Sequence, residues 1–410
     1  MAHRAMSKAW QLYRFLVRHV WHSWPLVLVA LGALLAIACL RLAGPSNINN
    51  YRIFAASWHH LVAQADLYAE YPQEYYDVYL YGPLFALLMA PLALLPTRVG
   101  VVLWVLLGNG VIVYAVRHLV PHLEASRRTV FLWVLLNELF IATLMQQYNL
   151  LVAGMLLLTF AFVERDQPIW AALMIVTGAL TKVYGLLGLL LFPFVKRKGR
   201  FILFGLLWLV VLLLLPLVMV SPEYLLSQYQ AWFTALTHKD CANMFSLMQN
   251  QGFVGLVRKS TGLSGYSDLW LIAPGVMLLL APLLRIGEYG REAFRRLFFS
   301  SIALFIVLFS TGTETNTYIV GYLGIGLWWI TCHEEHGFAW YDLALFIGAM
   351  IFSQTTSDLF PRTWRDQFLL PYSFKAFFPM LIWLRIQWLL WSKPGDTAEA
   401  ASEFRGAITG

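Results

Sequence analysis

Apolar segments separated by short polar connections follow one another along almost the whole chain. A helix that spans a membrane needs about 20 apolar residues, and about 12 segments approach that length. They are expected at about Pro25–Leu42, Val99–Val116, Val130–Met145, Leu150–Val163, Ile169–Thr181 and Tyr184–Val195, with six more between Arg200 and Lys393. This pattern predicts an all-α fold, a polytopic transmembrane helical bundle that forms one domain over residues 1–392.

The apolar stretch Tyr81–Pro96 is an exception within this pattern. It has only 16 residues and a proline close to each end. Such a segment is too short to span, so it is expected to lie in the membrane interface or to re-enter. We therefore predict an interfacial helix inside the first outer loop.

Composition agrees with a membrane protein. The 410 residues are 60% hydrophobic and 12% charged, whereas soluble domains carry roughly 25% charged residues. The net charge of +7 comes from short basic clusters between apolar segments, a pattern typical of membrane topology rather than of nucleic-acid binding. No nucleic-acid partner is expected, and the three cysteines show no metal-binding spacing.

The basic clusters also predict the orientation, because Lys and Arg concentrate in cytoplasmic loops. Arg4, Lys8, Arg14 and Arg18 assign the N-terminus to the cytoplasm. Alternation of the helices then assigns the polar tail 393–410 to the same side and the long loops 41–98 and 221–268 to the outer side. The expected location is the inner (plasma) membrane, with many spans and both termini cytoplasmic.

Carboxylates are the first candidates for chemistry on the outer side. Asp66, Glu74 and Asp77 lie in the first outer loop, and the last two stand among tyrosines that include Tyr81. Aromatic rings can stack on sugar faces, but they also form the belt at a membrane surface. A carboxylate at a surface is in most cases simply solvated, so this pattern alone leaves both interpretations open.

Cations on the outer side offer contacts for a phosphate. Lys182 lies between two apolar segments, where it would either bind phosphate or extend its amine to the interface. Arg362 and Arg365 could grip phosphate oxygens or pair locally with neighbouring aspartates. Glu138 lies in the middle of a predicted helix and therefore needs a partner inside the bundle.

Several landmarks resemble those of glycosyltransferase family 87, of the C-type glycosyltransferase superfamily of polyprenyl-phosphate-sugar-dependent membrane enzymes. The resemblance covers most of the chain. The landmarks are Asn50-Tyr51-Arg52-Ile53-Phe54, Ala65-Asp66-Leu67-Tyr68, Tyr81-Gly82-Pro83-Leu84, Ala90-Pro91-Leu92-Ala93-Leu94-Leu95-Pro96, Gln147-Tyr148-Asn149-Leu150-Leu151 and Thr181-Lys182-Val183-Tyr184.

The resemblance implies a lipid-linked sugar phosphate as donor and a catalytic carboxylate in the first outer loop. Where the family pattern tends to have Asp, this chain has Asn50, and an amide cannot accept a proton from an acceptor hydroxyl. The base is therefore expected at Asp77, with Glu74 and Asp66 as alternatives. Substrate-binding residues are expected at Asn50, Tyr81, Gln147, Asn149, Lys182, Glu314, Arg362 and Arg365.

The expected function is transfer of a sugar from a polyprenyl-phosphate donor to a lipid or cell-envelope glycan acceptor on the extracytoplasmic face, with membrane lipids as further partners. No cofactor or metal site is indicated, although a divalent cation is compatible with this chemistry. Two alternatives stay open at this point. The chain could transport or flip a lipid-linked or anionic solute, or it could be a non-catalytic assembly subunit, which the amide of Asn50 would favour.

Overall fold

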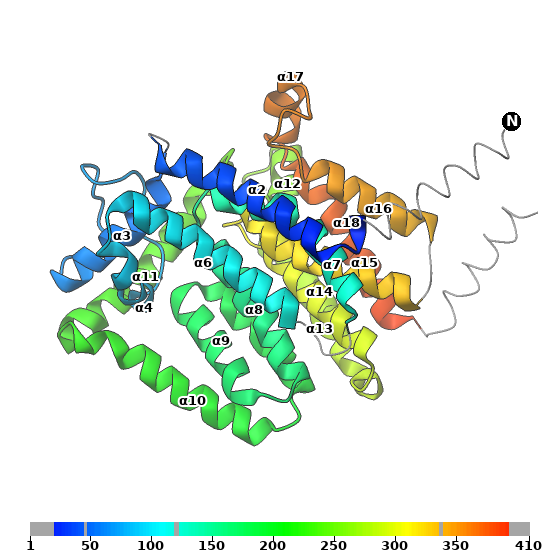
Figure 1. Ribbon diagram of the computed structural model, residues 1–410, viewed down its shortest axis with the longest axis horizontal. Coiled ribbons are helices and arrows are strands. Elements are labelled where there is room, and N and C mark those ends of the chain that lie inside the picture. Colours follow the sequence, from blue (N-terminus) through cyan, green and yellow to red (C-terminus); the bar gives the residue numbers. More distant parts are fainter. Residues whose placement is uncertain (1–19, 45–46, 119–122, 336–338, 393–410) are drawn as a thin grey trace, which may run out of the picture.

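The computed structural model describes residues 20–44, 47–118, 123–335 and 339–392, and these are helical with no strand (Figure 1). The all-α fold predicted from the hydrophobic pattern is confirmed. Two features used to predict the orientation lie outside the described residues, namely the basic N-terminus with Arg4, Lys8, Arg14 and Arg18, and the polar tail 393–410.

The helices of the first half follow the predicted segments closely. They are α2 (Trp24–Ala43), α3 (Asn49–Val62), α4 (Pro83–Leu88), α5 (Ala90–Ala93), α6 (Thr97–His118), α7 (Ala125–Leu144), α8 (Asn149–Glu164), α9 (Pro168–Thr181) and the 3₁₀ helix η2 (Val183–Phe194). The stretch 81–96 is divided between α4 and α5, so it is not one spanning helix.

The second half contains more short elements. They are α10 (Lys198–Leu214) with η3 (Leu215–Val218), α11 (Pro222–Ala242), α12 (Phe253–Thr261), α13 (Leu269–Leu280) with η4 (Ala281–Leu284), η5 (Ile286–Glu288), α14 (Glu292–Leu308), η6 (Thr315–Thr317), α15 (Tyr318–Glu335), α16 (Trp340–Phe352), α17 (Arg362–Trp364), the π-helical turn η7 (Arg365–Leu369), η8 (Phe374–Ala376) and α18 (Phe377–Trp391).

Three described segments are long and apolar enough to cross a membrane: α2, α6 and α10 with η3. A fourth arises if the segments 362–369 and 374–391, which are bent by 81° to each other, form one span. Other apolar helices, including α8, α9, η2 and α16, are shorter. The chain is an integral membrane protein, and the number of about 12 spans stays a prediction.

The helices differ in how much apolar surface they bury. In α8 nearly every residue is buried, including the polar Asn149 at its start and Thr159 in its second half. In α10 only Phe201 and Leu212 are buried, while most of its leucines and valines are exposed. A helix that is apolar all round is buried in protein or in lipid. Figure 1 shows α8 inside the bundle and α10 at its edge. We infer that the exposed apolar side chains of α10 face lipid.

One end of the bundle, here called the basic end, is held by ion pairs between helix termini. Glu334 near the end of α15 lies 2.7 Å from Arg127 of α7 and 2.5 Å from Arg296 of α14. Glu164 at the end of α8 lies 2.6 Å from Arg295 of α14. The predicted topology assigns these helix ends to the same, cytoplasmic side. The ion pairs show that they lie together in the structure.

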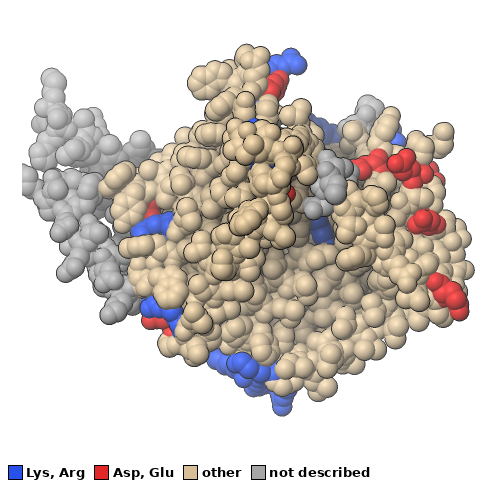
Figure 2. Space-filling view, turned by 180° about the vertical axis from the view of Figure 1, so that it is seen from behind, with Lys and Arg blue, Asp and Glu red and all other residues tan. Residues whose placement is uncertain are grey.

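The opposite end, here called the pocket end, gathers the connections between α3 and α4, between α7 and α8, between α9 and η2 and between α14 and α15. Figure 2 shows acidic side chains along the margin near α3 and α11, a basic cluster at the lower edge where α10 begins, and a broad surface without charged side chains between the two.

Candidate functional site

A cavity of about 230 Å³ opens at the pocket end. Its wall comes from segments far apart in the sequence, and six of the predicted site residues contribute to it. The lining comprises Asn50, Ile53, Phe54, Asp77, Val78, Leu80, Tyr81, Gln147, Lys182, Val183, Tyr184, Trp232, Leu236, Asn243, Gln249, Ser310, Thr311, Gly312 and Glu314.

Lys182 enters this cavity from the junction of α9 and η2. The two helices approach closely there because both contacting residues are glycines: a Cβ on Gly185 would lie 2.3 Å from the carbonyl carbon of Gly178. The amine of Lys182 donates to Oδ1 of Asn149 at 2.7 Å. Burial lowers the pKa of Lys182 to about 8, and the nearby Glu314 partly opposes this shift.

A chain of amides joins Lys182 to Glu314. Asn149 accepts from Lys182 and donates to Oε1 of Gln147 at 3.0 Å, and Gln147 donates to Oε2 of Glu314 at 2.6 Å. Glu314 also accepts from Asn316 at 3.1 Å and caps η6. Several donors therefore hold its carboxylate in one place, where it can also accept hydrogen bonds from a ligand.

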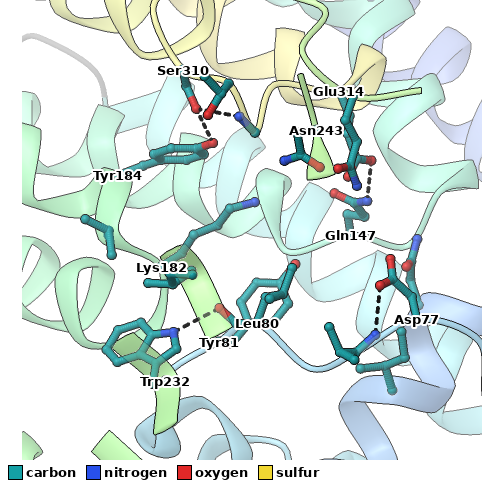
Figure 3. Close-up of a pocket in the computed structure, with 18 of the residues that line it drawn as sticks. Asp77, Leu80, Tyr81, Gln147, Lys182, Tyr184, Trp232, Asn243, Ser310 and Glu314 are labelled. Carbon is teal, nitrogen blue, oxygen red and sulfur yellow. Dashed lines mark hydrogen bonds between the residues drawn. The ribbon is translucent and has the colours of Figure 1, made fainter. Parts of the chain in front are cut away.

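Asp77 lines the cavity in an unusual backbone conformation. Its φ angle is +74°, in the left-handed region, which Asp tolerates better than most side chains because it can bond its own backbone. Its Oδ1 accepts from the backbone N–H of Val78 at 2.8 Å. In Figure 3 Asp77 and Lys182 lie on opposite sides of the cavity, with Tyr81 between them in that view. Strained residues of this kind are frequent at functional sites.

Asn50 also lines the cavity, and its amide is used inside the protein. Nδ2 donates to the carbonyl oxygen of Met145, directly after α7, at 2.8 Å. A carboxylate cannot donate to a carbonyl. Asn50 therefore joins α3 to the end of α7 in a way that the aspartate of the family pattern could not.

Aromatic side chains form the rest of the wall. Lys182 lies over the rings of Tyr81 and Tyr184, at 5.6 and 5.1 Å from their centroids. The hydroxyl of Tyr184 bonds Oγ of Ser310 at 2.7 Å, and Trp232 of α11 donates to the carbonyl of Leu80 at 3.0 Å. These rings give a sugar face a surface for stacking.

Five of the predicted site residues lie outside the lining: Asn149, which is bonded to Lys182, and Asp66, Glu74, Arg362 and Arg365. Asp66 accepts from the backbone of Tyr68 at 3.0 Å, and Glu74 pairs with His60 at 3.2 Å. Arg365 pairs with Asp358 and Asp366, each at 3.0 Å. Arg362 lies 3.4 Å from Asp366 and is largely exposed. In the structure both arginines are paired with the neighbouring aspartates, which is one of the two possibilities that the sequence left open.

Besides Phe54 and Tyr184, which lie within the motif landmarks, sequence reasoning missed five polar or aromatic residues of the wall: Trp232, Asn243, Gln249, Ser310 and Thr311. The first three lie in the second long loop, which has no motif of its own. Their positions could not be found from spacing, since only the fold brings this loop against the first one. Among the described residues, no group of three or more His, Cys, Asp or Glu side chains could hold a metal ion.

Comparison with solved structures finds similarity to the crystal structure of ArnT from Cupriavidus metallidurans bound to undecaprenyl phosphate. The TM-score is 0.39 at 15% sequence identity, and the alignment covers 88% of this chain and 76% of that one. No curated protein sequence matches the chain.

The sequence model of glycosyltransferase family 87 matches residues 79–311, more than half of the chain. The matched region contains Tyr81, Gln147 and Lys182 of the cavity wall, together with Asn149, which is bonded to Lys182. The chain therefore belongs to glycosyltransferase family 87 and is a membrane glycosyltransferase.

Proposed function

We propose that this chain transfers a neutral hexose or pentose from a polyprenyl-phosphate donor to a lipid or cell-envelope glycan acceptor, on the extracytoplasmic face of the inner membrane. One observation carries the proposal: a single cavity at the pocket end combines a carboxylate, Asp77, with a partly buried cation, Lys182. Transfer from a sugar phosphate needs a base for the acceptor and a cation for the phosphate. The exposed leucines and valines of α10 offer an apolar surface for a long lipid tail.

In the proposed reaction Asp77 accepts the proton of the acceptor hydroxyl. The hydroxyl oxygen then forms a bond to the anomeric carbon of the sugar, while the bond from that carbon to the donor phosphate breaks and its electron pair stays on the phosphate. Attack from the opposite side inverts the anomeric centre. A positioned general base contributes typically about 10²–10⁴-fold to the rate.

Lys182 would stabilise the charge that develops on the leaving phosphate. Its tie to Asn149 fixes the amine at the cavity wall without neutralising it, because the amide carries no charge. Arg362 and Arg365 remain candidates for a second phosphate contact only if they leave the aspartates that pair with them.

Sugar hydroxyls would bond to Glu314 and to the amides around it, with a sugar face against Tyr81 or Tyr184. The preference for a neutral sugar follows from the polar groups of this wall, which are amides, hydroxyls and one carboxylate besides the two groups named above. An acidic sugar would meet Glu314, and among the described residues of the lining Lys182 is the one cation.

The experiment is an assay of purified protein with labelled polyprenyl-phosphate sugars and envelope lipids, comparing Asp77→Asn with the matched variant Glu70→Gln. Asn tolerates the left-handed conformation of residue 77 and can keep the bond from Val78, so the exchange removes the base with little change in fold. We expect kcat to fall by about 10²–10⁴-fold in Asp77→Asn, with donor binding retained. Glu70→Gln should behave as wild type.

Two further variants decide which carboxylate is the base. If Asp66→Asn or Glu74→Gln abolishes turnover while Asp77→Asn does not, the base lies outside the cavity and the assignment to Asp77 is wrong. If folded wild-type protein transfers no sugar from any polyprenyl-phosphate donor, the proposed donor class is wrong. Uptake of a labelled solute into vesicles, unchanged in Asp77→Asn, would instead support transport.

A further inference from the structure

The side chain of Asn49, at the start of α3, bonds the loop that carries Asp77 at the residue directly before it. Nδ2 of Asn49 donates to the carbonyl oxygen of Tyr76 at 2.8 Å, and Oδ1 of Asn49 accepts from the N–H of the same residue at 2.8 Å. A carboxamide has one donor and one acceptor side, so it can pair with both backbone groups of one residue as a neighbouring strand would. The two residues are 27 positions apart in the sequence.

This pairing acts on the peptide group that joins Tyr76 to Asp77. The carbonyl held by Asn49 belongs to that peptide group, so its orientation is fixed where the left-handed conformation of Asp77 begins. The ring of Tyr76 is 80% exposed and gives the loop no anchor of its own. On the far side of Asp77 the chain is held at Leu80, whose carbonyl accepts from Trp232 at 3.0 Å, and at Gly82, whose N–H donates to the carbonyl of Thr181 at 3.1 Å.

Asn49 is suited to this role because α3 fixes it. It is the first residue of that helix, and α3 packs against both α4 and α5. The next residue, Asn50, lines the cavity itself. The start of α3 therefore contacts both the cavity and the backbone of the loop that brings the carboxylate to it.

We infer that Asn49 is a positioning residue, which holds the carboxylate of Asp77 in its catalytic place through the backbone of Tyr76. The inference rests on the proposed function, since it assumes that Asp77 is the base. Asn49 does not contact the substrate. Its contribution is to keep a strained backbone in one conformation, and a displacement of about 1 Å at a reacting group can lower a rate about a hundredfold.

The test compares Asn49→Leu with Asn47→Leu in full-length protein. Both variants replace an amide by an apolar side chain of similar size at the start of α3. Asn49→Leu removes both bonds to Tyr76, whereas Asn47→Leu removes only the bond to the first turn of the helix. We expect kcat for sugar transfer to fall about tenfold to a hundredfold in Asn49→Leu, with little change in KM for the donor. Asn47→Leu should stay within about twofold of wild type, because residue 47 has no bond to the loop.

A second measurement does not depend on turnover. Hydrogen exchange of the Tyr76 amide should become faster in Asn49→Leu, because this N–H loses its acceptor, and should be unchanged in Asn47→Leu. Exchange in α8 and α14 should be unaltered in both variants, which separates a local change from loss of the fold.

The outcomes separate this inference from the proposed function. If Asp77→Asn loses kcat but Asn49→Leu keeps it, Asn49 does not position the base, although the proposed function stands. If Asn49→Leu loses kcat and Asp77→Asn does not, Asn49 acts through another group and the inference is wrong. Unchanged exchange at Tyr76 in Asn49→Leu would also overturn it, even if no donor had been found.

Discussion

The amine of Lys375 lies 2.9 Å from Oε1 of Glu138, although the two residues are 237 positions apart in the sequence. Their side chains are 3% and 0% exposed, so both charges are buried in the bundle. Lys375 also donates to the carbonyl oxygen of Thr315 at 3.3 Å. Because Thr315 directly follows Glu314, this ion pair supports the cavity wall from behind.

Removal of one member of this pair should destabilise the protein strongly. Glu138→Leu or Lys375→Met alone leaves a buried charge without its partner, which costs about 3–5 kcal/mol. The double variant Glu138→Leu/Lys375→Met should recover most of that loss, since an apolar pair of similar volume is often as stable as a buried ion pair. Thermal unfolding in detergent measures both effects. Additive losses in the double variant would contradict a direct interaction.

The pH dependence of the enzyme should report Lys182. Burial lowers its pKa to about 8, so the free enzyme loses this cation as the pH rises through about 8. We expect kcat/KM for the donor to fall over that range, because it reflects ionisation in the free enzyme. Lys182→Arg, with an intrinsic pKa above about 12, should remove this alkaline limb even if activity is lower. A limb that stays at the same pH in Lys182→Arg would assign it to another group.

Gly82 should not tolerate a larger side chain. A Cβ at this position would lie 1.9 Å from the carbonyl oxygen of Leu180, in the segment that leads to Lys182. Gly82→Ala must therefore move the Asp77 loop away from α9, and we expect a loss of about 1–3 kcal/mol in stability together with reduced turnover. Gly110→Ala is the control, because a Cβ there meets no atom within 4 Å and alanine favours a helix. Equal Tm values for the two variants would contradict this account.

Aspartate at position 50 should not restore the family arrangement. The amide of Asn50 donates to the carbonyl of Met145, and a carboxylate there would lose that bond and face an acceptor. We expect Asn50→Asp to lower stability by about 1–3 kcal/mol and to leave the double variant Asn50→Asp/Asp77→Asn inactive. Sugar transfer by that double variant would show that position 50 can still supply the base.

The sequence predicted the helices better than their contacts. Hydropathy gives the apolar helices of the first half their approximate limits, whereas α3, α11 and α12 lie inside the stretches predicted as outer loops. The cost of a charge in lipid required a partner for Glu138, which is confirmed. That Lys375 is this partner could not be predicted, because the argument needs only some opposite charge nearby. Lys182 was expected at a helix junction, but its link to Glu314 runs through two amides that only the fold brings together.

Contacts made by backbone groups were the hardest to predict. The pairing of Asn49 with Tyr76 leaves no periodicity in the sequence, and asparagines before a helix are common for other reasons. For Arg362 and Arg365 the sequence allowed both a ligand and a local pair, and the structure has the local pair. Whether these arginines also contact substrate stays a prediction.

The 3₁₀ helix η2 has a mechanical consequence for the enzyme. A 3₁₀ helix rises about 2.0 Å per residue against 1.5 Å in an α-helix, so the 12 residues of η2 cover about 24 Å instead of about 18 Å. The stretched form lets a short segment connect Tyr184 beside the cavity to the basic loop at the other surface. An α-helix of the same 12 residues would be about 6 Å shorter. The 3₁₀ form of η2 therefore sets the distance between Tyr184 at the cavity and the basic segment that follows Phe194.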